Sequence, residues 1–454
     1  MNRKTRLSLA VGVALLTVPL PVLAQNGTPT PAPSPSPTTQ AALPAAGTPP
    51  PPARPLLRDS LLAAAPSVIP FGNGRSLQLG GFVYSRYDDA RNSDRTGFPA
   101  FPEGSGTPNG YNGNGDNGFN NSTFKIRESR IFAQTTFSAN VKAMVEIAPS
   151  GQFNTTPAGS TAINTRRLYG QYTFGDGKPD KLMITAGQFW NPFGFAISNP
   201  LPFWYAPERP LLGKESARGL WDGQEFDRGV QLSLAPKDAF LSLSVINGTG
   251  LTSNDTNRAR DIVLRARKFY PTAGLSFGGS YYSGTFAASV TTGTGQAAVT
   301  TIKGDAERSL FGLDLQYTSP SLQGGPFLQA EYVGGTLEAV APITLGDPKA
   351  TTPTFPSAFV SGNKIEGYSF IGGWTFGKSS AHPYSLIGLY DVLKRNKNIS
   401  TLQDSNYGFG ASYNLSPGVK ARLFWMQPDK VAYPVGTTKP KNVGLLTADL
   451  LFVL

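Results

Sequence analysis

The 454-residue sequence contains no cysteine and a single histidine. Without cysteine the chain forms no disulfide, has no catalytic thiolate and offers no thiol for a lipoprotein anchor. The histidine, His382, precedes Pro383 and has no nucleophile–base pattern around it. We therefore interpret it as structural and disfavour a serine–histidine hydrolase. The sequence predicts no catalytic residue, no cofactor and no enzyme.

Long apolar runs are scarce as well. Three cations precede an apolar stretch at residues 7–18, and residues 22–24 offer a cleavage site, which predicts a signal peptide over residues 1–24. No later run is long enough for a membrane-spanning helix. Loss of the three cations lowers the net charge from +11 to about +8, which suits anionic solutes or acidic surfaces. No nucleic-acid motif accompanies this charge, so no nucleic-acid partner is expected.

Metal-binding patterns are also missing. Polar residues Asn254, Asp255, Asn257 and Asp261 follow one another closely in the sequence. Their spacing does not meet that of a calcium loop. We interpret them as solvated loop residues and expect no metal.

The sequence does contain segments in which apolar residues recur at every second position. In the segment 444–454 one parity carries Thr447 and Asp449, whereas the other is apolar throughout. The apolar residues are Leu446, Ala448, Leu450, Phe452 and Leu454. This pattern predicts a β-strand with one apolar face. A barrel in lipid needs such a strand, because its last strand closes against its first and leaves no unpaired backbone edge. A soluble β-sandwich, the alternative, leaves the apolar face unexplained.

The same alternation recurs upstream and predicts sixteen strands, joined alternately by short turn-forming links and by long polar links. The predicted spans are 76–87, 123–136, 141–148, 165–175, 180–189, 228–236, 239–247, 260–269, 273–283, 308–318, 326–336, 366–376, 382–391, 403–414, 419–427 and 442–454. We therefore expect an all-β fold, a transmembrane antiparallel up-and-down β-barrel over residues 76–454, with both termini on the periplasmic side. Sixteen strands leave room for a water-filled channel.

A proline-rich tract precedes the predicted barrel. Residues 25–53 are dominated by Pro, Thr, Ala and Ser, cannot bury a core and predict an extended linker. We assign residues 25–75 to a Pro-rich periplasmic linker. Two hypotheses stay open for residues 25–53: contact with the cell wall, or an unstructured tail.

Alternation also sorts the charged side chains between the two faces, because a charge on the lipid face costs about 2–4 kcal/mol at the bilayer midplane. The cations placed inside are Lys142, Arg167, Arg265, Arg267, Lys420 and Arg422. Arg127 and Arg130 lie on opposite parities, so a bulge or a strand end must intervene. The carboxylates placed inside are Glu146, Asp261, Asp314, Glu331 and Asp449. The cations are candidates for a pore-lining anion path; alternatively, they pair with these carboxylates.

Five segments carry a family resemblance. They are FKIRESR at 124–130, GQFWNPFG at 187–194, DRGVQLS at 227–233, LSLSVINGTG at 241–250 and RDIVLRA at 260–266. In this order and spacing they resemble motifs of the phosphate-selective porin O and P family of bacterial outer membranes. Two features depart from that family. The sequence ends in Leu454 rather than an aromatic residue, and Arg127 is followed by Glu128 where the family often has paired arginines.

The resemblance implies an outer-membrane porin for passive diffusion of small hydrophilic solutes. It further implies a homotrimer in contact with lipid and lipopolysaccharide, and a preference for small anionic solutes that extends to phosphate or polyphosphate. Two alternatives remain. One is a nonselective general porin, and the other is an envelope-tethering protein anchored through its Pro-rich segment.

The long connection at residues 191–227 combines several prolines with aromatic residues. Loops of this length are usually functional or disordered, and proline limits their freedom. The resemblance implies a loop that folds into the lumen as a constriction, and the alternative is a lid packed on the outer rim. The candidate constriction residues are Phe203, Trp204, Tyr205, Arg209, Lys214, Arg218 and Trp221.

Overall fold

A computed structural model describes most of the predicted barrel and a short segment before it. The described residues are 67–72, 74–90, 121–150, 162–198, 205–213, 220, 225–250, 259–292, 299–321, 323–338, 362–378, 382–430 and 444–453. The predicted signal peptide and most of the predicted linker, residues 1–66, lie outside this set. Within it, no helix has the length and apolar character needed to cross a membrane.

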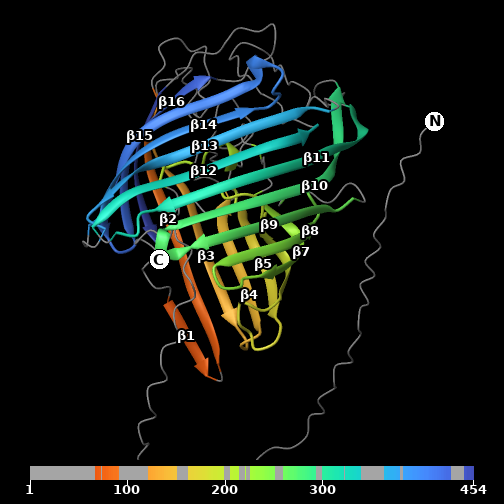
Figure 1. Ribbon diagram of the computed structural model, residues 1–454, viewed down its shortest axis with the longest axis vertical. Helices are drawn as coiled ribbons and strands as arrows, with labels where there is room; N and C mark the ends of the chain where they lie inside the picture. The colour runs from red at the N-terminus through yellow and green to blue at the C-terminus, as the bar shows by residue number, and fades with distance from the viewer. Residues whose placement is uncertain are drawn as a thin grey trace, which may run out of the picture. The chain divides into compact units, whose positions relative to one another are not determined.

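Strands form most of the described chain (Figure 1). Their bounds are β1 Ser67–Gly72, β2 Arg75–Ala90, β3 Asn121–Thr136, β4 Val141–Ser150, β5 Ala162–Thr173, β6 Met183–Trp190, β7 Phe226–Leu234, β8 Ala239–Ile246, β9 Asp261–Tyr270, β10 Leu275–Thr292, β11 Val299–Thr318, β12 Gly324–Leu337, β13 Lys364–Phe376, β14 Tyr384–Lys394, β15 Gln403–Ser416, β16 Val419–Lys430 and β17 Leu445–Val453. Short 3-10 segments include η3 (Leu211–Gly213), η4 (Pro271–Ala273) and η6 (Ser400–Leu402).

Sixteen of the described strands close into an antiparallel barrel. From β2 to β17 each strand pairs with the next one in the sequence, including β9 with β10. The last strand, β17, returns to pair with β2, with Val453 opposite Phe82 and Leu445 opposite Ala90. The predicted sixteen-stranded barrel is confirmed. The start of β2 and the end of β17 both lie on the side of the short turns.

Two differences from the predicted spans concern segments with weak alternation. Residues 67–72, assigned above to the linker, form β1, in which Ser67 pairs with Leu79 of β2. The hairpin of β10 and β11 continues past the predicted strand ends, to Thr292 and Val299. The sequence between residues 284 and 307 is rich in Thr, Gly and Ala and has no apolar parity. Backbone hydrogen bonds extend these strands whatever their side chains are, so the sequence shows no alternation there.

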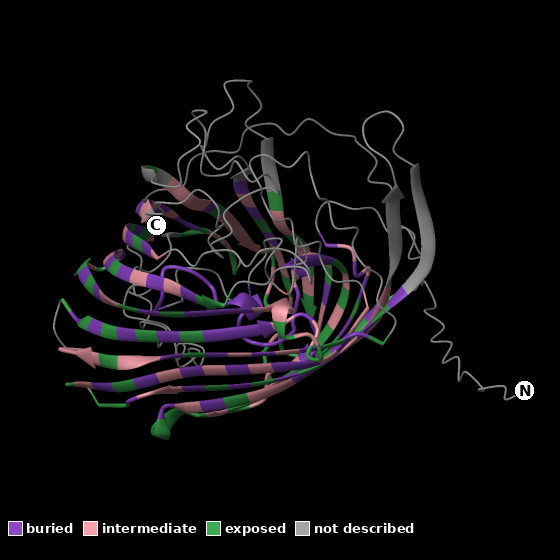
Figure 2. Ribbon diagram, turned by 90° about the horizontal axis from the view of Figure 1, so that it is seen from above, coloured by how far each residue is buried: buried purple, intermediate pink, exposed green. Residues whose placement is uncertain are grey.

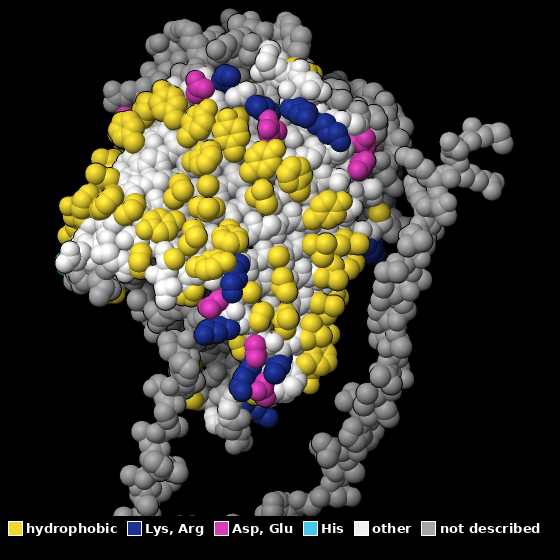
Figure 3. Space-filling model, viewed as in Figure 1, with side chains coloured by type: hydrophobic (Ala, Val, Ile, Leu, Met, Phe, Trp, Pro, Cys, Tyr) yellow, Lys and Arg dark blue, Asp and Glu magenta, His cyan; other side chains and the backbone are white. Residues whose placement is uncertain are grey.

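The two faces of the barrel wall differ as alternation requires. On β11, Leu313 is 59% exposed and its neighbour Asp314 is 4% exposed. Val230, Ile262 and Phe409 are likewise exposed apolar residues. Figure 3 shows hydrophobic side chains over the middle of the outer face, with charged side chains gathered towards its ends. This outer face suits lipid, and buried residues alternate with exposed ones along the strands (Figure 2).

Two β-bulges interrupt the alternation at arginine residues. In β3, Arg127 is an extra residue facing the step from Tyr84 to Ser85 of β2. In β5, Arg166 is an extra residue beside Arg167. A bulge re-aims a side chain without shifting the rest of the strand to the other face. Of the two possibilities that the arginines of β3 left open, a bulge or a strand end, the structure shows the bulge.

Candidate functional site

The connection between β6 and β7 runs along the inside of the barrel. Its described residues, which we call the inner loop, are 191–198, 205–213, 220 and 225. Nearly all of them are buried. Phe193, Ile197 and Leu211 belong to the same apolar cluster as the wall residues Phe327 and Val333. The inner loop therefore packs against the inner wall, within the ring of strands in Figure 2.

A carboxylate of β12 anchors the first part of the inner loop. The backbone amides of Phe195 and Ala196 donate to the two carboxylate oxygens of Glu331, at 3.1 and 2.6 Å. Gly194 precedes them with a φ of +60°, and a Cβ at this position would lie 2.0 Å from Glu331 Oε1. Glycine alone suits both the left-handed backbone and this close approach. The Pro-Phe-Gly turn of the sequence motif thus brings the loop onto the wall.

The second part of the inner loop is held from the strands on either side of the barrel closure. Arg422 of β16 donates to the carbonyl of Ala206 at 3.2 Å, and the hydroxyl of Tyr84 on β2 donates to the carbonyl of Pro207 at 2.9 Å. Asp449 of β17 lies beneath both donors, 2.8 Å from Arg422 Nε and 3.0 Å from the Tyr84 hydroxyl. Three strands therefore position one short stretch of loop backbone.

Contacts with β12 and β14 complete the attachment. The ring of Tyr205 stacks on that of Phe327, with centroids 3.7 Å apart and planes 13° from parallel. The backbone amide of Leu211, in η3, donates to Asp391 Oδ2 at 2.9 Å. Because each polar partner is a buried group satisfied by the loop, removing a contact leaves an unpaired donor or acceptor.

Glu208 of the inner loop joins two arginines from adjacent strands. Arg127 Nε lies 2.9 Å from Glu208 Oε1, and Arg86 of β2 pairs with the same carboxylate. Arg86 also lies 2.7 Å from Asp88. The bulge in β3 thus places Arg127 at the loop rather than in the lipid-facing row.

Glu225, at the end of the inner loop, collects three arginines. Arg209 lies 2.7 Å from its carboxylate, Arg130 3.1 Å and Arg166 3.9 Å. Burial alone would raise the pKa of Glu225, but these guanidinium groups outweigh it and lower the pKa to about 2. The ring of Trp190 stacks beneath Arg130 and Arg209, 5.0 and 5.4 Å from their guanidinium carbons.

The arginines of β9 share a single carboxylate on β11. Arg265 lies 2.9 Å from Asp314 and donates to the hydroxyl of Ser280 at 2.7 Å. Arg267 Nε lies 3.8 Å from the same Asp314. The guanidinium of Arg267 also lies 5.7 Å from the ring of Phe195 in the inner loop.

The remaining cations predicted to line the wall are Arg167, Lys142 and Lys420. Arg167 pairs with Glu146, which also lies 3.1 Å from Arg130. Lys142 is half-buried on the inward parity of β4, and Lys420 is fully buried on β16.

In three of these ion pairs the guanidinium group is markedly more exposed than its carboxylate partner, whereas in the pair of Arg130 with Glu146 it is not. The side chain of Arg166 is 22% exposed and that of its partner Glu225 is 1% exposed. Arg167 is 20% exposed against 4% for Glu146, and Arg267 is likewise more exposed than its partner. Water in the lumen therefore meets guanidinium groups first, with the carboxylates behind them, which favours anions locally.

The structure brings most of the sequence-predicted site residues to the inner wall or inner loop. These are Arg127, Arg130, Lys142, Arg167, Tyr205, Arg209, Arg265, Arg267, Lys420 and Arg422. The predicted loop residues outside the described set are Phe203, Trp204, Lys214, Arg218 and Trp221. Pairing with inward carboxylates, the alternative considered for the cations, is observed for Arg130, Arg167, Arg265, Arg267 and Arg422.

Sequence reasoning missed several members of these networks. They are Arg86, Arg166, Glu208 and Glu225. A signal for one of them was present, because the adjacent Arg166 and Arg167 occupy opposite parities, as Arg127 and Arg130 do. The two loop carboxylates carried no comparable signal, since a loop has no period.

His382 lies in the short turn after β13. Its Nδ1 is 3.1 Å from the carbonyl oxygen of Asn414, and its ring stacks with that of Tyr413. Asp261, considered above as a solvated acid, instead lies 4.0 Å from Arg308, and residues 254–257 fall outside the described set. Among the described residues no group of three or more potential ligands could hold a metal ion.

Comparison with known proteins supports the motif resemblance. The model of the phosphate-selective porin O and P family matches residues 106–308, which confirms the resemblance drawn from the sequence motifs. No curated protein matches the chain.

Solved structures of outer-membrane porins share the fold. OmpF of Salmonella typhi, in complex with daunomycin, matches with a TM-score of 0.54 and 9% identity over 86% of this chain and 100% of its own. An anion-selective porin from Comamonas acidovorans matches with a TM-score of 0.51 and 12% identity over 84% and 100%. The trimer form of OmpT of Vibrio cholerae matches with a TM-score of 0.50 and 10% identity over 84% and 100%. At these identities the likeness shows the fold alone.

Proposed function

We propose that this outer-membrane porin, which is similar to the phosphate-selective porin O and P family, passes small hydrophilic solutes passively and prefers anions. A sixteen-stranded barrel is wide enough for a water-filled lumen. The observation that carries the anion preference is the layering of charge, in which Arg166, Arg167 and Arg267 are more exposed than their carboxylate partners. Rings of arginine and lysine are a recurrent device of anion pores.

Reversal potentials in a salt gradient test this preference. Arg167→Gln and Arg267→Gln remove the outer layer of charge and should shift permeability towards cations. Lys268→Gln is the matched control, because Lys268 follows Arg267 in β9 and is exposed on the opposite face. A wild-type channel that already prefers potassium over chloride contradicts the proposal.

The inner loop is, in this proposal, the constriction of the channel. Its support is the set of contacts that hold it to β2, β12, β14 and β16 inside the barrel. Deletion of residues 200–220 should raise single-channel conductance. Unchanged conductance in a correctly assembled deletion variant would assign the loop to the rim instead.

In this proposal the full chain is exported with cleavage of residues 1–24 and carries residues 25–75 as a periplasmic linker. It assembles as a homotrimer, which the similar fold of the trimer form of OmpT supports. It contacts lipid and lipopolysaccharide, carries out no catalysis and uses no cofactor.

Deletion of residues 26–53 distinguishes a channel from an envelope tether. A channel keeps its conductance, whereas a tether loses association with the cell wall.

A nonselective general porin is the second candidate. The specific observation in its favour is pairing, because Arg265 and Arg422 lie within 2.9 Å of Asp314 and Asp449. Cations neutralised in this way contribute little to selectivity. Equal permeability to potassium and chloride would identify this case.

A further inference from the structure

A cavity of about 540 Å³ lies on the inner wall beneath the first part of the inner loop. Its lining comes from β5 to β9, from Pro192 and Ser198 of the loop, and from the short turns at Pro179, Pro236 and Pro271. It therefore lies in the short-turn half of the barrel. Its volume falls within the range of roughly 300–1,000 Å³ that is typical of small-molecule sites.

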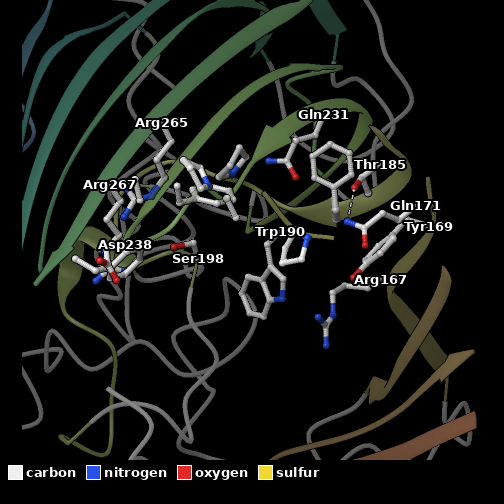
Figure 4. Close-up of a pocket in the computed structure, with 18 of the residues that line it drawn as sticks. Arg167, Tyr169, Gln171, Thr185, Trp190, Ser198, Gln231, Asp238, Arg265 and Arg267 are labelled. Carbon is white, nitrogen blue, oxygen red and sulfur yellow. Dashed lines mark hydrogen bonds between the residues drawn. The ribbon is translucent and has the colours of Figure 1, made fainter. Parts of the chain in front are cut away.

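Aromatic and cationic side chains both contribute to this lining. The aromatic ones are Tyr169, Phe189, Trp190, Phe240 and Phe269, and the cationic ones are Arg167, Arg265 and Arg267. Figure 4 shows Arg265 and Arg267 on one side of the cavity and Arg167 on the other, with Trp190 between them. Wall residues that only keep water in a pore need charge or hydrogen bonds; a row of rings does not serve that purpose.

We propose that this cavity, the aryl site, binds aromatic carboxylates on their way through the channel. The proposal rests on the anion-preferring porin function proposed above and names a solute class for it. The ring of such a solute stacks on the aromatic lining, and its carboxylate binds a guanidinium group.

Ring and charge come together at one place on β8 and β9. Phe240 is directly opposite Arg267 across these two strands. The guanidinium of Arg267 also lies 5.1 Å from the ring of Phe269. A flat anion placed against Phe240 thus reaches Arg267 without leaving the aromatic surface, and a planar guanidinium suits both a carboxylate and a ring.

The local charge balance leaves room for an anion. Arg265 and Arg267 share the single carboxylate of Asp314, so the two guanidinium groups are not fully neutralised by it. Glu331, the next carboxylate along the wall, accepts two backbone amides of the inner loop. Asp238 also lines the cavity, yet it stands against three arginines.

The lining fits an aryl carboxylate better than inorganic phosphate. Phosphate is surrounded by acceptor oxygens on every side and needs donors all around it. Here the five rings occupy much of the wall, and they would remove water from phosphate without replacing its hydrogen bonds. An aryl carboxylate presents its polar atoms at one end only.

Block of chloride current through the purified full-length porin in planar bilayers tests the proposal. The probes are benzoate, cyclohexanecarboxylate, which keeps the charge but not the flat ring, and inorganic phosphate. Benzoate should halve the chloride current at a concentration about threefold or more below that of cyclohexanecarboxylate and about tenfold or more below that of phosphate. Phe240→Leu should remove the advantage of benzoate over cyclohexanecarboxylate. Arg267→Gln should weaken both carboxylates about tenfold, and Lys268→Gln should change neither.

Three results overturn the proposal. Chloride current that benzoate leaves unchanged shows a porin without an aryl site. Equal block by benzoate and cyclohexanecarboxylate shows that the rings take no part, and stronger block by phosphate assigns the arginines to a phosphate path. An assembled wild-type protein without chloride current contradicts the porin function itself, and this outcome is distinguishable from the other three.

Discussion

Removal of the Glu331 carboxylate should release the first part of the inner loop. Glu331→Ala leaves the amides of Phe195 and Ala196, now bonded at 3.1 and 2.6 Å, as buried donors without an acceptor. Each unsatisfied buried group costs about 1–3 kcal/mol, so the docked loop loses about 2–6 kcal/mol. The lower figure already shifts the equilibrium between docked and undocked loop about thirtyfold. The other anchors, at Asp391 and Arg422, hold the second part in place.

Single-channel conductance and limited proteolysis of the folded protein measure this release. The variant should show a higher or fluctuating conductance and faster cleavage within the loop. Glu307→Ala is the matched control, since Glu307 lies on β11 with an exposed side chain. Heat-modifiable electrophoretic mobility reports whether each barrel has assembled. An assembled Glu331→Ala porin with unchanged conductance and unchanged protease resistance would refute the reasoning.

Three further changes test individual features. Gly194→Ala should reproduce the conductance of Glu331→Ala, because its Cβ would lie 2.0 Å from the carboxylate in a left-handed backbone. Deletion of Arg127 should still permit barrel assembly, since it removes only a bulge residue. Deletion of Ser244 in the regular strand β8 should prevent assembly, because it moves the side chains of half the strand to the opposite face. An Arg127 deletion variant that does not assemble would disprove the bulge. The lowered pKa of Glu225 makes its contribution to loop docking complete above about pH 4.5 and lost as the pH falls towards about 2. Conductance recorded between pH 7 and 2 should therefore change only below about pH 4.5, and a change near neutral pH would contradict this assignment.

The barrel was predictable because lipid on one side and water on the other impose period two on every strand. Leu313 and Asp314 took the faces that their parity assigned. An interruption of the alternation in β3, either a bulge or a strand end, was predictable because Arg127 and Arg130 have opposite parity and could not both avoid lipid otherwise. The ends of β10 and β11 were not predictable, because the residues after 283 and before 308 show no alternation of apolar and polar side chains.

The contacts of the inner loop could not be predicted from the sequence, for a different reason. The bond from Ala196 to Glu331 joins residues 135 positions apart, and that from Arg422 to the carbonyl of Ala206 joins residues 216 apart. Such pairings depend on how the closed barrel places β12 and β16 against the loop. Parity put Glu331 and Arg422 inside, but it could not say that they hold backbone groups rather than solutes.

The strand β1 has a consequence for the edge of β2 that extends beyond the barrel closure. β2 is longer than its partner β17, which reaches only as far as Phe82. The protruding edge would offer unpaired amides and carbonyls as a template for a foreign strand. β1 continues the line of β17 and pairs with Ser76 to Leu79 on that same edge. The short segment thus protects against edge-to-edge aggregation, because it pairs with most of the described stretch of β2 that β17 leaves unpaired.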